Sequence, residues 1–373
     1  MHSTLSQPLK ITDVPWSQRI AASALNRYPL SKGQWHYKHG LLFKGVFHLW
    51  ERAGDKKYWD NLLAYVDHYV TPSGEIKTYS PKEYSIDQIN PGKLLFPVYR
   101  ETKKERYKRA IFLLREQLCH QPRTNEGGFW HKKIYPYQMW LDGIYMGSPF
   151  LTKYAATFEE PSIFDDVALQ ITALEKHARD PKTGLLYHAW DESRQMPWAN
   201  PETGCSPHFW SRGIGWFVMA IADVLDDFPT DHPSRSELNA ILERTLTAIA
   251  EMQDDPTGLW WQILDQGNRP GNYLEASGTS MFIYAIAKGI RKGYLSRSWL
   301  VIAQKAFNGL IDHLITVDDT GSVDLHGICS TAGLGGTPYR DGSFEYYVGE
   351  PIITNDLHGV GSLLLAALEI ENL

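Results

Sequence analysis

The fold is indicated by two stretches that read almost alike, DPKTGLLYHAWD at positions 180–191 and DDPTGLWWQILD at positions 254–265. Each stretch places a glycine turn ahead of a short aromatic segment. Weaker relatives of this pattern begin at Thr71, Thr124 and Asp318. Self-similarity at intervals of roughly 60 residues is typical of proteins built from repeated units. The chain of 373 residues therefore predicts about six such units.

Two kinds of helix alternate with these turns. The first kind has one apolar stripe and charged remaining faces, as in FDDVALQITALEKHA at 164–178, and is typical of helices that cover a core on one side. The second kind is poorer in charge and richer in glycine, which predicts burial on most sides. We place these buried helices at 40–51, 86–100, 140–156, 209–225, 275–292 and 356–369.

Six buried helices inside six amphipathic ones, with 15–27 as the first outer helix, predict an all-α (α/α)6 barrel. We expect one catalytic domain over residues 1–373. An open helical solenoid is the alternative. A solenoid needs polar capping repeats, and the sequence shows none.

Composition excludes several classes of protein. The net charge of −6 and the lack of a Lys/Arg-rich run argue against a nucleic-acid partner. No apolar run approaches the ~20 residues of a membrane helix, and the start MHSTLSQPLK lacks the apolar core of a signal peptide. We expect a cytoplasmic protein without a membrane partner, either a monomer or a weak homo-oligomer. Three cysteines without metal spacing predict buried thiols.

One carboxylate lies where an aromatic segment becomes a buried helix. In QMWLDGIYMGSPF, at 138–150, Asp142 follows Trp140 and precedes Met146 and Phe150 at helical spacing. An acid beside an apolar face costs several kcal/mol unless it is paired, protonated or functional. A helix N-cap is the simpler interpretation, because Asp is a favoured capping residue.

Polar residues recur at the start of every buried helix. They are His36 and His39, Asp87, Asp142, Arg212, Glu275 and Ser277, and Asp356 and His358. All would face one mouth of the barrel. Separate N-caps explain the acids one by one, but they do not explain Arg212, a cation placed against the helix dipole. A shared pocket explains the set better.

Asp87 and Asp142 come from neighbouring buried helices and could approach one another. Two close carboxylates raise one of their pKa values, and desolvation by Trp140 would act in the same direction. A carboxylic acid that stays protonated near neutral pH is what a sugar-cleaving enzyme uses as its proton donor. Two independent caps remain the alternative.

The aromatic residues, 13 Trp and 20 Tyr, favour a carbohydrate site, because flat rings form the walls of sugar subsites as well as cores. Arg212, flanked by Trp210 and Trp216, suits stacking and bidentate capture of a carboxylate. The alternative is an arginine whose stem covers apolar surface. His188 could donate a hydrogen bond to a sugar, although a histidine among aromatic residues is more often structural.

Other chemistries find little support in the sequence. His36 and His39 could share a metal, but no HExxH motif or carboxylate triad accompanies them, so we expect no metal and no cofactor. GLGGTPYRDG, from Gly333, lacks the GK[ST] ending of a phosphate loop and is better interpreted as a lid or rim loop. No GxSxG or Cys/His signature indicates a nucleophilic hydrolase.

Several segments together resemble one family, the unsaturated rhamnogalacturonyl hydrolases of glycoside hydrolase family 105. They are QWHYKHG, SIDQINPGKLLFP, EGGFWHKKIYPYQMWLDGIYMGSPF, TGLLYHAWDE, MPWANPETGCSPHFWSRGIGW, EASGTS and NDLHGVG. The resemblance spans nearly the whole chain. Its most specific part is WLDGIYMGSPF followed by a W-x-R-x-x-G-W element.

The resemblance implies a metal-free hydration of the C4=C5 double bond of a terminal unsaturated uronic acid. An acid protonates C4, water adds at C5, and the hemiketal opens and releases rhamnose. The implied substrate is a small oligosaccharide, unsaturated galacturonyl-rhamnose from rhamnogalacturonan. The resemblance makes Asp142 the general acid/base and Asp87 its carboxylate neighbour. The implied substrate contacts are Trp35, His36, Tyr37, His131, Lys132, Trp140, His188, Trp210, Arg212 and Trp216.

Four alternatives remain open from the sequence. They are an unsaturated glucuronyl hydrolase acting on glycosaminoglycan fragments, an inverting glycosidase for saturated substrates, a non-catalytic sugar-binding protein, and an epimerase using His188 and His358. Hydration alone consumes the conjugated double bond and its ultraviolet absorbance. Loss of this absorbance therefore distinguishes an unsaturated uronyl hydrolase of either kind from the glycosidase, the sugar-binding protein and the epimerase.

Overall fold

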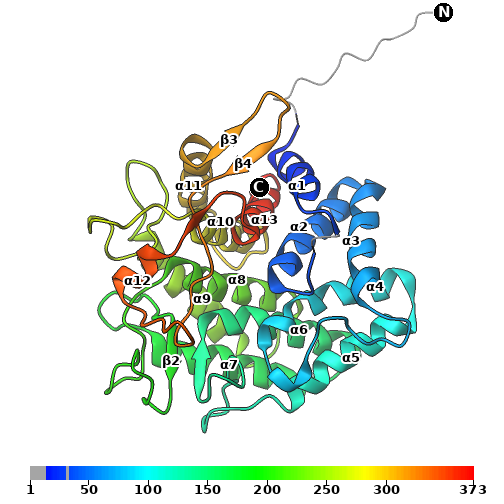
Figure 1. Cartoon of the computed structure of the whole chain (residues 1–373), viewed down its shortest axis with the longest axis horizontal. Helices are drawn as coiled ribbons and strands as arrows, with labels where there is room; N and C mark the ends of the chain where they lie inside the picture. Colours follow the sequence, from blue (N-terminus) through cyan, green and yellow to red (C-terminus); the bar gives the residue numbers. More distant parts are fainter. Residues whose placement is uncertain (1–13, 31–32) are drawn as a thin grey trace, which may run out of the picture.

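The computed structural model describes residues 14–30 and 33–373 (Figure 1). The segment MHSTLSQPLK, in which we expect no signal peptide, lies outside the described residues. The inner helices are α2 (Tyr37–Ala53), α4 (Leu95–Thr102), α6 (Leu141–Phe158), α8 (Ser211–Asp227), α10 (Ala276–Arg291) and α13 (Leu357–Ile370). The outer helices are α1 (Trp16–Arg27), α3 (Lys56–Tyr69), α5 (Glu105–Cys119), α7 (Ser162–Ala178), α9 (Arg235–Ala250) and α11 (Leu300–His313).

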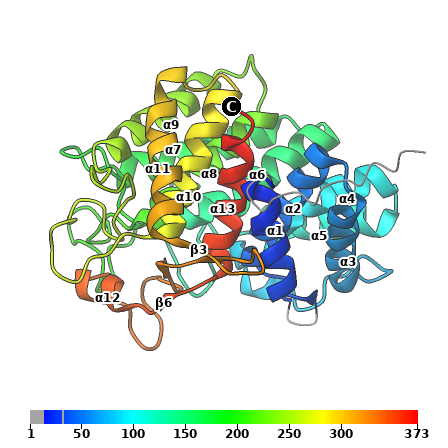
Figure 2. The same ribbon diagram turned by 90° about the horizontal axis from the view of Figure 1, so that it is seen from above.

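The inner helices form a closed ring. Contacts run from α6 to α8, from α8 to α10, from α10 to α13 and from α13 to α2, and the segment before α4 packs against both α2 and α6. Each outer helix packs on an inner neighbour, and α1 lies against α13. Figures 1 and 2 show this double arrangement from two directions. The predicted (α/α)6 barrel is confirmed, and the open solenoid is excluded by the contact between α13 and α2.

Burial separates the two kinds of helix as the sequence predicts. In α8 every residue from Ser211 to Leu225 is buried. In the outer helix α3 the buried residues fall on one stripe: Tyr58, Leu62, Tyr65, Val66 and Tyr69. Removing apolar surface from water stabilises the fold by about 25 cal/mol per Å². The inner ring therefore supplies much of the core, while each outer helix contributes one face.

The prediction of a continuous inner helix over 86–100 is wrong. The structure has two 3-10 segments, η4 (Ile86–Gln88) and η5 (Asn90–Leu94), before α4 begins. Pro91 explains the break, because proline lacks the backbone N–H and its ring clashes with the preceding helical turn. Asp87 consequently lies in a 3-10 turn rather than at the start of an α-helix.

Short hairpins and loops lie at the end of the barrel where the inner helices begin (Figure 2). Strand β1 (Gln138–Trp140) pairs with β2 (Ala189–Asp191), and β3 (Ile315–Val317) pairs with β4 (Val323–Leu325). Strand β5 (Ile328–Cys329) pairs with β6 (Ile352–Ile353), and the short helix α12 (Phe344–Gly349) lies between them in sequence. All three sheets are antiparallel.

Two further sequence expectations concern membranes and thiols. Within the described residues, no helix is both long and apolar enough to cross a membrane. Cys205 and Cys329 are buried free thiols as expected, but Cys119 is exposed, so the expectation of three buried thiols is wrong for it.

Ring closure depends on a glycine at the contact between α13 and α2. A Cβ added at Gly361 would lie 2.9 Å from Leu41 Cγ and 3.1 Å from the Leu42 backbone nitrogen. We predict that Gly361→Val lowers the free energy of unfolding by about 1–3 kcal/mol, the usual range for overpacking a core. Urea denaturation measures this change.

The matched control is Gly349→Val. Gly349 is exposed, and a Cβ there meets nothing within 4 Å. Equal stability of the two variants would contradict the close approach of α13 to α2.

Candidate active site

Asp142 lies in the first turn of α6, directly after strand β1. The N-cap of α6 is Trp140, the last residue of β1, in extended conformation. The N-cap interpretation of Asp142 is therefore wrong. The position still suits an acid, because the positive end of a helix dipole stabilises negative charge in the first turn. The Asp142 side chain retains 15% of its exposure, so the carboxylate is shielded but reachable.

The β1–β2 pairing brings His188 to this carboxylate. Trp140 pairs with Ala189, and the Leu141 N–H donates to the His188 carbonyl at 3.0 Å. His188 Nε2 then lies 3.0 Å from Asp142 Oδ2. The imidazole is fully buried. The structure thus joins the predicted general acid directly to a histidine that the sequence suggests as a sugar contact.

Tyr347, from α12, completes a chain of three polar groups. Its hydroxyl lies 2.7 Å from His188 Nδ1, on the side of the ring away from Asp142. Burial raises the pKa of Tyr347 well above its ordinary value, and the nearby charge of Asp142 acts in the same direction. The phenol therefore stays protonated. With both ring nitrogens engaged, His188 is held in one orientation.

Aromatic rings border this chain on two sides. Trp140 stacks on His131, with ring centroids 4.7 Å apart, and on Tyr135, with centroids 4.8 Å apart. The Trp210 ring also borders His188, with ring centroids 4.7 Å apart. The Gly333 loop reaches this wall, because Arg340 donates to the Tyr135 hydroxyl at 2.9 Å. This contact agrees with the prediction that the loop from Gly333 forms part of the rim.

Asp87 is held by two basic groups. Its Oδ2 lies 2.6 Å from Lys132 Nζ, and its Oδ1 lies 3.3 Å from His131 Nε2. Burial alone would raise the pKa of Asp87, but the charges of Lys132 and His131 outweigh burial and hold the pKa well below its ordinary value. Asp87 is therefore ionised at neutral pH, so the pKa rise predicted for one carboxylate of the pair does not occur at Asp87.

The segment before α2 lies beside Asp87. His36 caps α2 by accepting from the Lys38 N–H at 3.4 Å, and burial lowers its pKa while Asp87 opposes this effect. Trp35 is 3% exposed and donates to the Gln88 carbonyl at 3.0 Å. Trp35 thus braces the turn that carries Asp87.

Tyr37 is a buried phenol whose pKa is influenced by the charges of both carboxylates. Burial raises the pKa of Tyr37, and the charges of Asp87 and Asp142 both add to this effect. Its hydroxyl lies 2.8 Å from His358 Nε2. The Tyr37 hydroxyl thus has His358 as its hydrogen-bond partner, and a contact of Tyr37 with a substrate stays a prediction.

Arg212 occupies a more interior position than the sequence suggests. Its guanidinium donates to the carbonyls of Cys329, at 2.6 Å, and Ser330, so it fastens the β5 segment to the start of α8. The guanidinium lies 4.8 Å from the Trp210 ring, while Trp216 stacks on Tyr145 in the core. Contact of Arg212 and Trp216 with a substrate stays a prediction.

Two of the acids at the mouth are helix caps. Glu275 accepts from the Gly278 N–H at 2.6 Å, and Asp356 accepts from the His358 N–H at 2.9 Å. Asp356 also pairs with Lys38 at 3.0 Å. For these two residues the explanation by separate caps holds, while the contact with His188 sets Asp142 apart.

Comparison with known proteins places this geometry in a family. Residues 16–373 match the model of Glycosyl Hydrolase Family 88. The chain belongs to this family. It is also 46% identical to a glycoside hydrolase of family 105 from C. acetobutylicum, with a TM-score of 0.94 over 96% of this chain and all of the other. The resemblance found in the sequence is thereby confirmed.

Two other relatives bear more specific names. The chain is 28% identical to the unsaturated rhamnogalacturonyl hydrolase YesR of Bacillus subtilis, over 78% of each chain. An unsaturated glucuronyl hydrolase from Bacillus sp. GL1 has a TM-score of 0.68 at 14% identity, with 95% of each chain covered, which shows a shared fold.

Tyr347 is the residue of this family 88 chain that sequence reasoning missed. It lies 159 positions after His188 in a short helix within a loop region, so no periodicity connects the two. A polar residue in an aromatic segment (FEYYVG) is a weak signal. Only the folded chain shows that its hydroxyl reaches the imidazole.

Lys132 provides a test of the charge balance at Asp87. We predict that Lys132→Met raises the pKa of Asp87, because it removes the ammonium 2.6 Å from Oδ2. Carbon-13 NMR titration of aspartate carboxyls, assigned with Asp87→Asn, measures the shift. A carboxyl group whose pKa in the folded state lies below its unfolded value of about 3.9 stabilises the fold above that pH. This stabilisation is lost as the pH falls through the folded-state pKa. The variant should therefore lose this stabilisation at a higher pH.

Lys133→Met is the matched control, because Lys133 is the neighbouring lysine and has no contact with Asp87 among the described side chains. An unchanged Asp87 pKa in Lys132→Met would contradict the assignment.

Proposed function

We propose that this family 88 chain is an unsaturated uronyl hydrolase that adds water to the C4=C5 double bond of unsaturated galacturonyl-rhamnose. The observation that carries the proposal is the contact of Asp142 with His188 at 3.0 Å, beside the Trp140 ring and at the start of α6. This arrangement supplies a positioned acid/base next to an aromatic surface on which a sugar ring can stack.

The proposed reaction begins with Asp142. Protonated Asp142 gives its proton to C4, the electron pair of the double bond forms the C4–H bond, and positive charge develops at C5 and the ring oxygen. Water attacks C5 and returns a proton to Asp142. The resulting hemiketal opens by breaking the bond between C5 and the ring oxygen: the C5 hydroxyl loses its proton and becomes a ketone, while the ring oxygen gains a proton and becomes a hydroxyl on C1. The hemiacetal left at C1 then expels rhamnose, so one water molecule is consumed overall.

The His188–Tyr347 pair suits both protonation states of Asp142. When Asp142 is ionised, His188 Nε2–H donates to it and Nδ1 accepts from the Tyr347 hydroxyl. When Asp142 is protonated, its hydroxyl donates to Nε2 and Nδ1–H donates to Tyr347. The distances of 3.0 Å and 2.7 Å fit either direction. A residue that first donates and then accepts a proton needs such a partner.

Asp87 supplies fixed negative charge in the proposed mechanism. Lys132 and His131 keep its carboxylate ionised, as the lowered pKa indicates. Preorganised charge near a developing cation lowers the energy of the transition state. We therefore assign Asp87 to stabilisation of the charge at C5 rather than to proton transfer.

The similarity to YesR supports the choice of a rhamnogalacturonan fragment as substrate. The similarity to the glucuronyl enzyme is one of fold alone. Assays with unsaturated galacturonyl-rhamnose, an unsaturated glucuronyl disaccharide and a saturated galacturonyl-rhamnose separate the candidates. We expect fastest turnover of the first substrate, and preference for either of the others would contradict the proposed specificity.

Asp142→Asn tests the acid/base assignment. Asparagine keeps the shape of the side chain but cannot protonate carbon, so we predict a loss of at least the 10²–10⁴-fold that general acid–base catalysis contributes. Turnover is followed by loss of ultraviolet absorbance and release of rhamnose. The control is Asp165→Asn, because Asp165 is exposed on the outer helix α7. Near-normal turnover by a folded Asp142→Asn variant would disprove the assignment.

Tyr347→Phe tests the positioning of His188. Loss of the hydroxyl leaves Nδ1 of a buried imidazole without the partner that both proton arrangements use. We predict a kcat at least about tenfold lower with little change in KM, and a changed pH profile of kcat, because acid–base catalysis depends on this contact.

The matched control is Tyr346→Phe, the adjacent tyrosine, whose hydroxyl accepts from the Gly333 N–H. A rise in KM alone, or equal effects of the two variants on kcat and its pH profile, would contradict a role of Tyr347 through His188.

A further inference from the structure

A polar cavity lies at the opposite end of the barrel from Asp142, where most of the inner helices end. Its volume is about 420 Å³. Lining residues come from the later parts of α2, α6, α8 and α10, and from the segment of η5 and α4. The apolar wall includes Phe47, Leu94, Phe96, Pro97 and Pro149. Small-molecule sites in proteins begin at about 300 Å³, so the cavity is large enough for a compact ligand.

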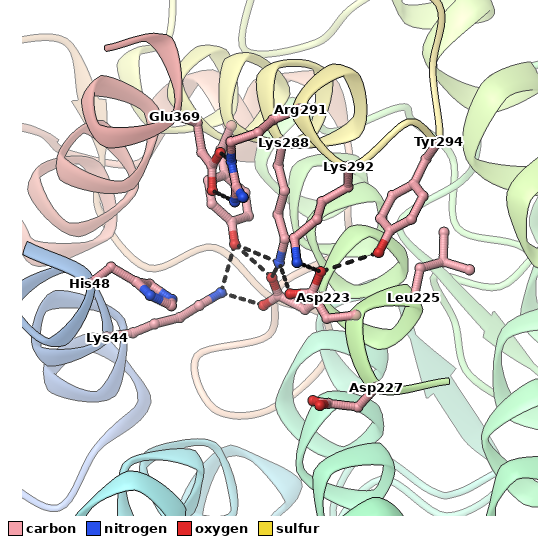
Figure 3. Close-up of polar contacts among 12 residues, drawn as sticks. Lys44, His48, Asp223, Leu225, Asp227, Lys288, Arg291, Lys292, Tyr294 and Glu369 are labelled. Atoms are coloured by element: carbon pink, nitrogen blue, oxygen red, sulfur yellow. Dashed lines mark hydrogen bonds and ion pairs between the residues drawn. The ribbon is translucent and has the colours of Figure 1, made fainter. Parts of the chain in front are cut away.

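Lysines and one aspartate form the polar wall near the barrel axis. Lys44 and Lys288 both contact Asp223, the second at 2.6 Å, and Figure 3 shows the two ammonium groups converging on this carboxylate. Tyr284 donates to Asp223 at 2.6 Å. The carboxylate is thus saturated by two cations and a phenol.

The other acids around the cavity also have partners. Asp226 pairs with Lys288 at 2.7 Å, Asp227 pairs with Lys153 at 3.0 Å, and Glu51 contacts His48 at 3.0 Å. Each carboxylate that lines the cavity is therefore paired with a basic side chain of the protein itself.

Lys93 has no such partner. It is 8% exposed, and within the described part of the chain its ammonium nitrogen makes no hydrogen bond and no ion pair. The nitrogen lies 3.6 Å from the centroid of the Tyr145 ring, which gives a cation–π contact. Such a contact contributes about 2 kcal/mol, less than the cost of burying an unpaired charge.

The helix dipole does not explain Lys93 either. Lysines in the last turns of helices complement the negative end of the dipole, and Lys288 in α10 is an example. Lys93 instead lies two residues before α4, at the positive end of that helix. Burial lowers the pKa of Lys93 well below its ordinary value, and the charge of Lys44 adds to this effect. Burial likewise lowers the pKa of Lys44 to about 8, against the opposing charge of Asp223.

We infer that this cavity, defined by Lys93, Lys44 and the apolar wall above, binds a small sugar-like acid through its carboxylate or phosphate. The bound anion accepts a hydrogen bond from the Lys93 nitrogen and favours its protonated form, which burial disfavours in the absence of a partner, and the apolar wall covers the carbon skeleton. Neither Lys93 nor Lys44 takes part in the proposed reaction, so the inference is independent of the proposed function.

Isothermal titration calorimetry at low salt and pH 7 tests the inference with three probes of matched skeleton. They are gluconate, which bears a carboxylate, sorbitol 6-phosphate, and neutral sorbitol. We expect one of the two anions to bind with one-to-one stoichiometry and sorbitol not to bind. The anion that binds identifies the charged group that the site recognises. Binding by neither anion would overturn the inference.

Lys93→Met locates the bound anion. This variant keeps the length of the side chain and removes the ammonium, so we expect affinity at least tenfold weaker. The control Lys182→Met removes one charge from an exposed position outside the cavity and should leave affinity unchanged. Unchanged affinity in Lys93→Met would overturn the inference.

A second variant decides the matter if Lys93→Met does not fold. Thr157 is exposed and lines the cavity at the end of α6, so Thr157→Trp should obstruct the cavity without disturbing the core. Retention of full anion affinity in that variant would equally contradict binding at this site.

Discussion

The contact between Asp142 and His188, extended by Tyr347, is the interaction on which the proposed chemistry depends. Three segments supply these groups: the start of α6, the residue before β2, and α12. The β1–β2 pairing sets Asp142 against His188, and α12 places Tyr347 behind the imidazole. Because both nitrogens of His188 are engaged, the ring holds one orientation while the carboxylate changes its protonation state. A mobile imidazole would not keep its nitrogen in place beside the Asp142 carboxylate.

The parallel direction of the inner helices divides the barrel into two polar ends. Asp142 lies in the first turn of α6, where the helix dipole favours an anion, and Lys288 lies in the last turn of α10, where the dipole favours a cation. Both ends nevertheless carry charges of both signs, because Lys132 lies at the Asp142 end and Asp223 and Asp226 lie at the other. Lys93 is set apart from the other lysines of the cavity because it precedes a helix and has no ion-pair partner within the described residues.

The sequence predicts the barrel well because the barrel depends on local pattern. Helical periodicity and the glycine turns are local, and they yield both rings and the direction of the inner helices. The exception is 86–100, where apolar spacing suggests a helix but Pro91 breaks it into 3-10 turns. Steric exclusion by one proline outweighs the apolar pattern of that segment.

The site is less predictable because it depends on contacts between distant segments. Asp142 and His188 are recognisable as polar residues among aromatic ones, yet their contact follows from strand register. The engagement of Arg212 with the β5 carbonyls and of Asp87 with Lys132 also requires the folded chain. A cap could be assigned to Asp356 from residue type, whereas Asp142 lies within the first turn of α6 and contacts His188, which residue type alone does not show.

Proton NMR of the reaction in deuterated water tests the central claim, enzyme-catalysed hydration, most directly. The claim predicts that the vinyl H4 signal of unsaturated galacturonyl-rhamnose disappears at the rate at which rhamnose appears. It also predicts one deuterium at C4, in a single configuration, because Asp142 delivers it from one face. Release of rhamnose while the vinyl signal persists would show direct cleavage of the glycosidic bond and contradict the account.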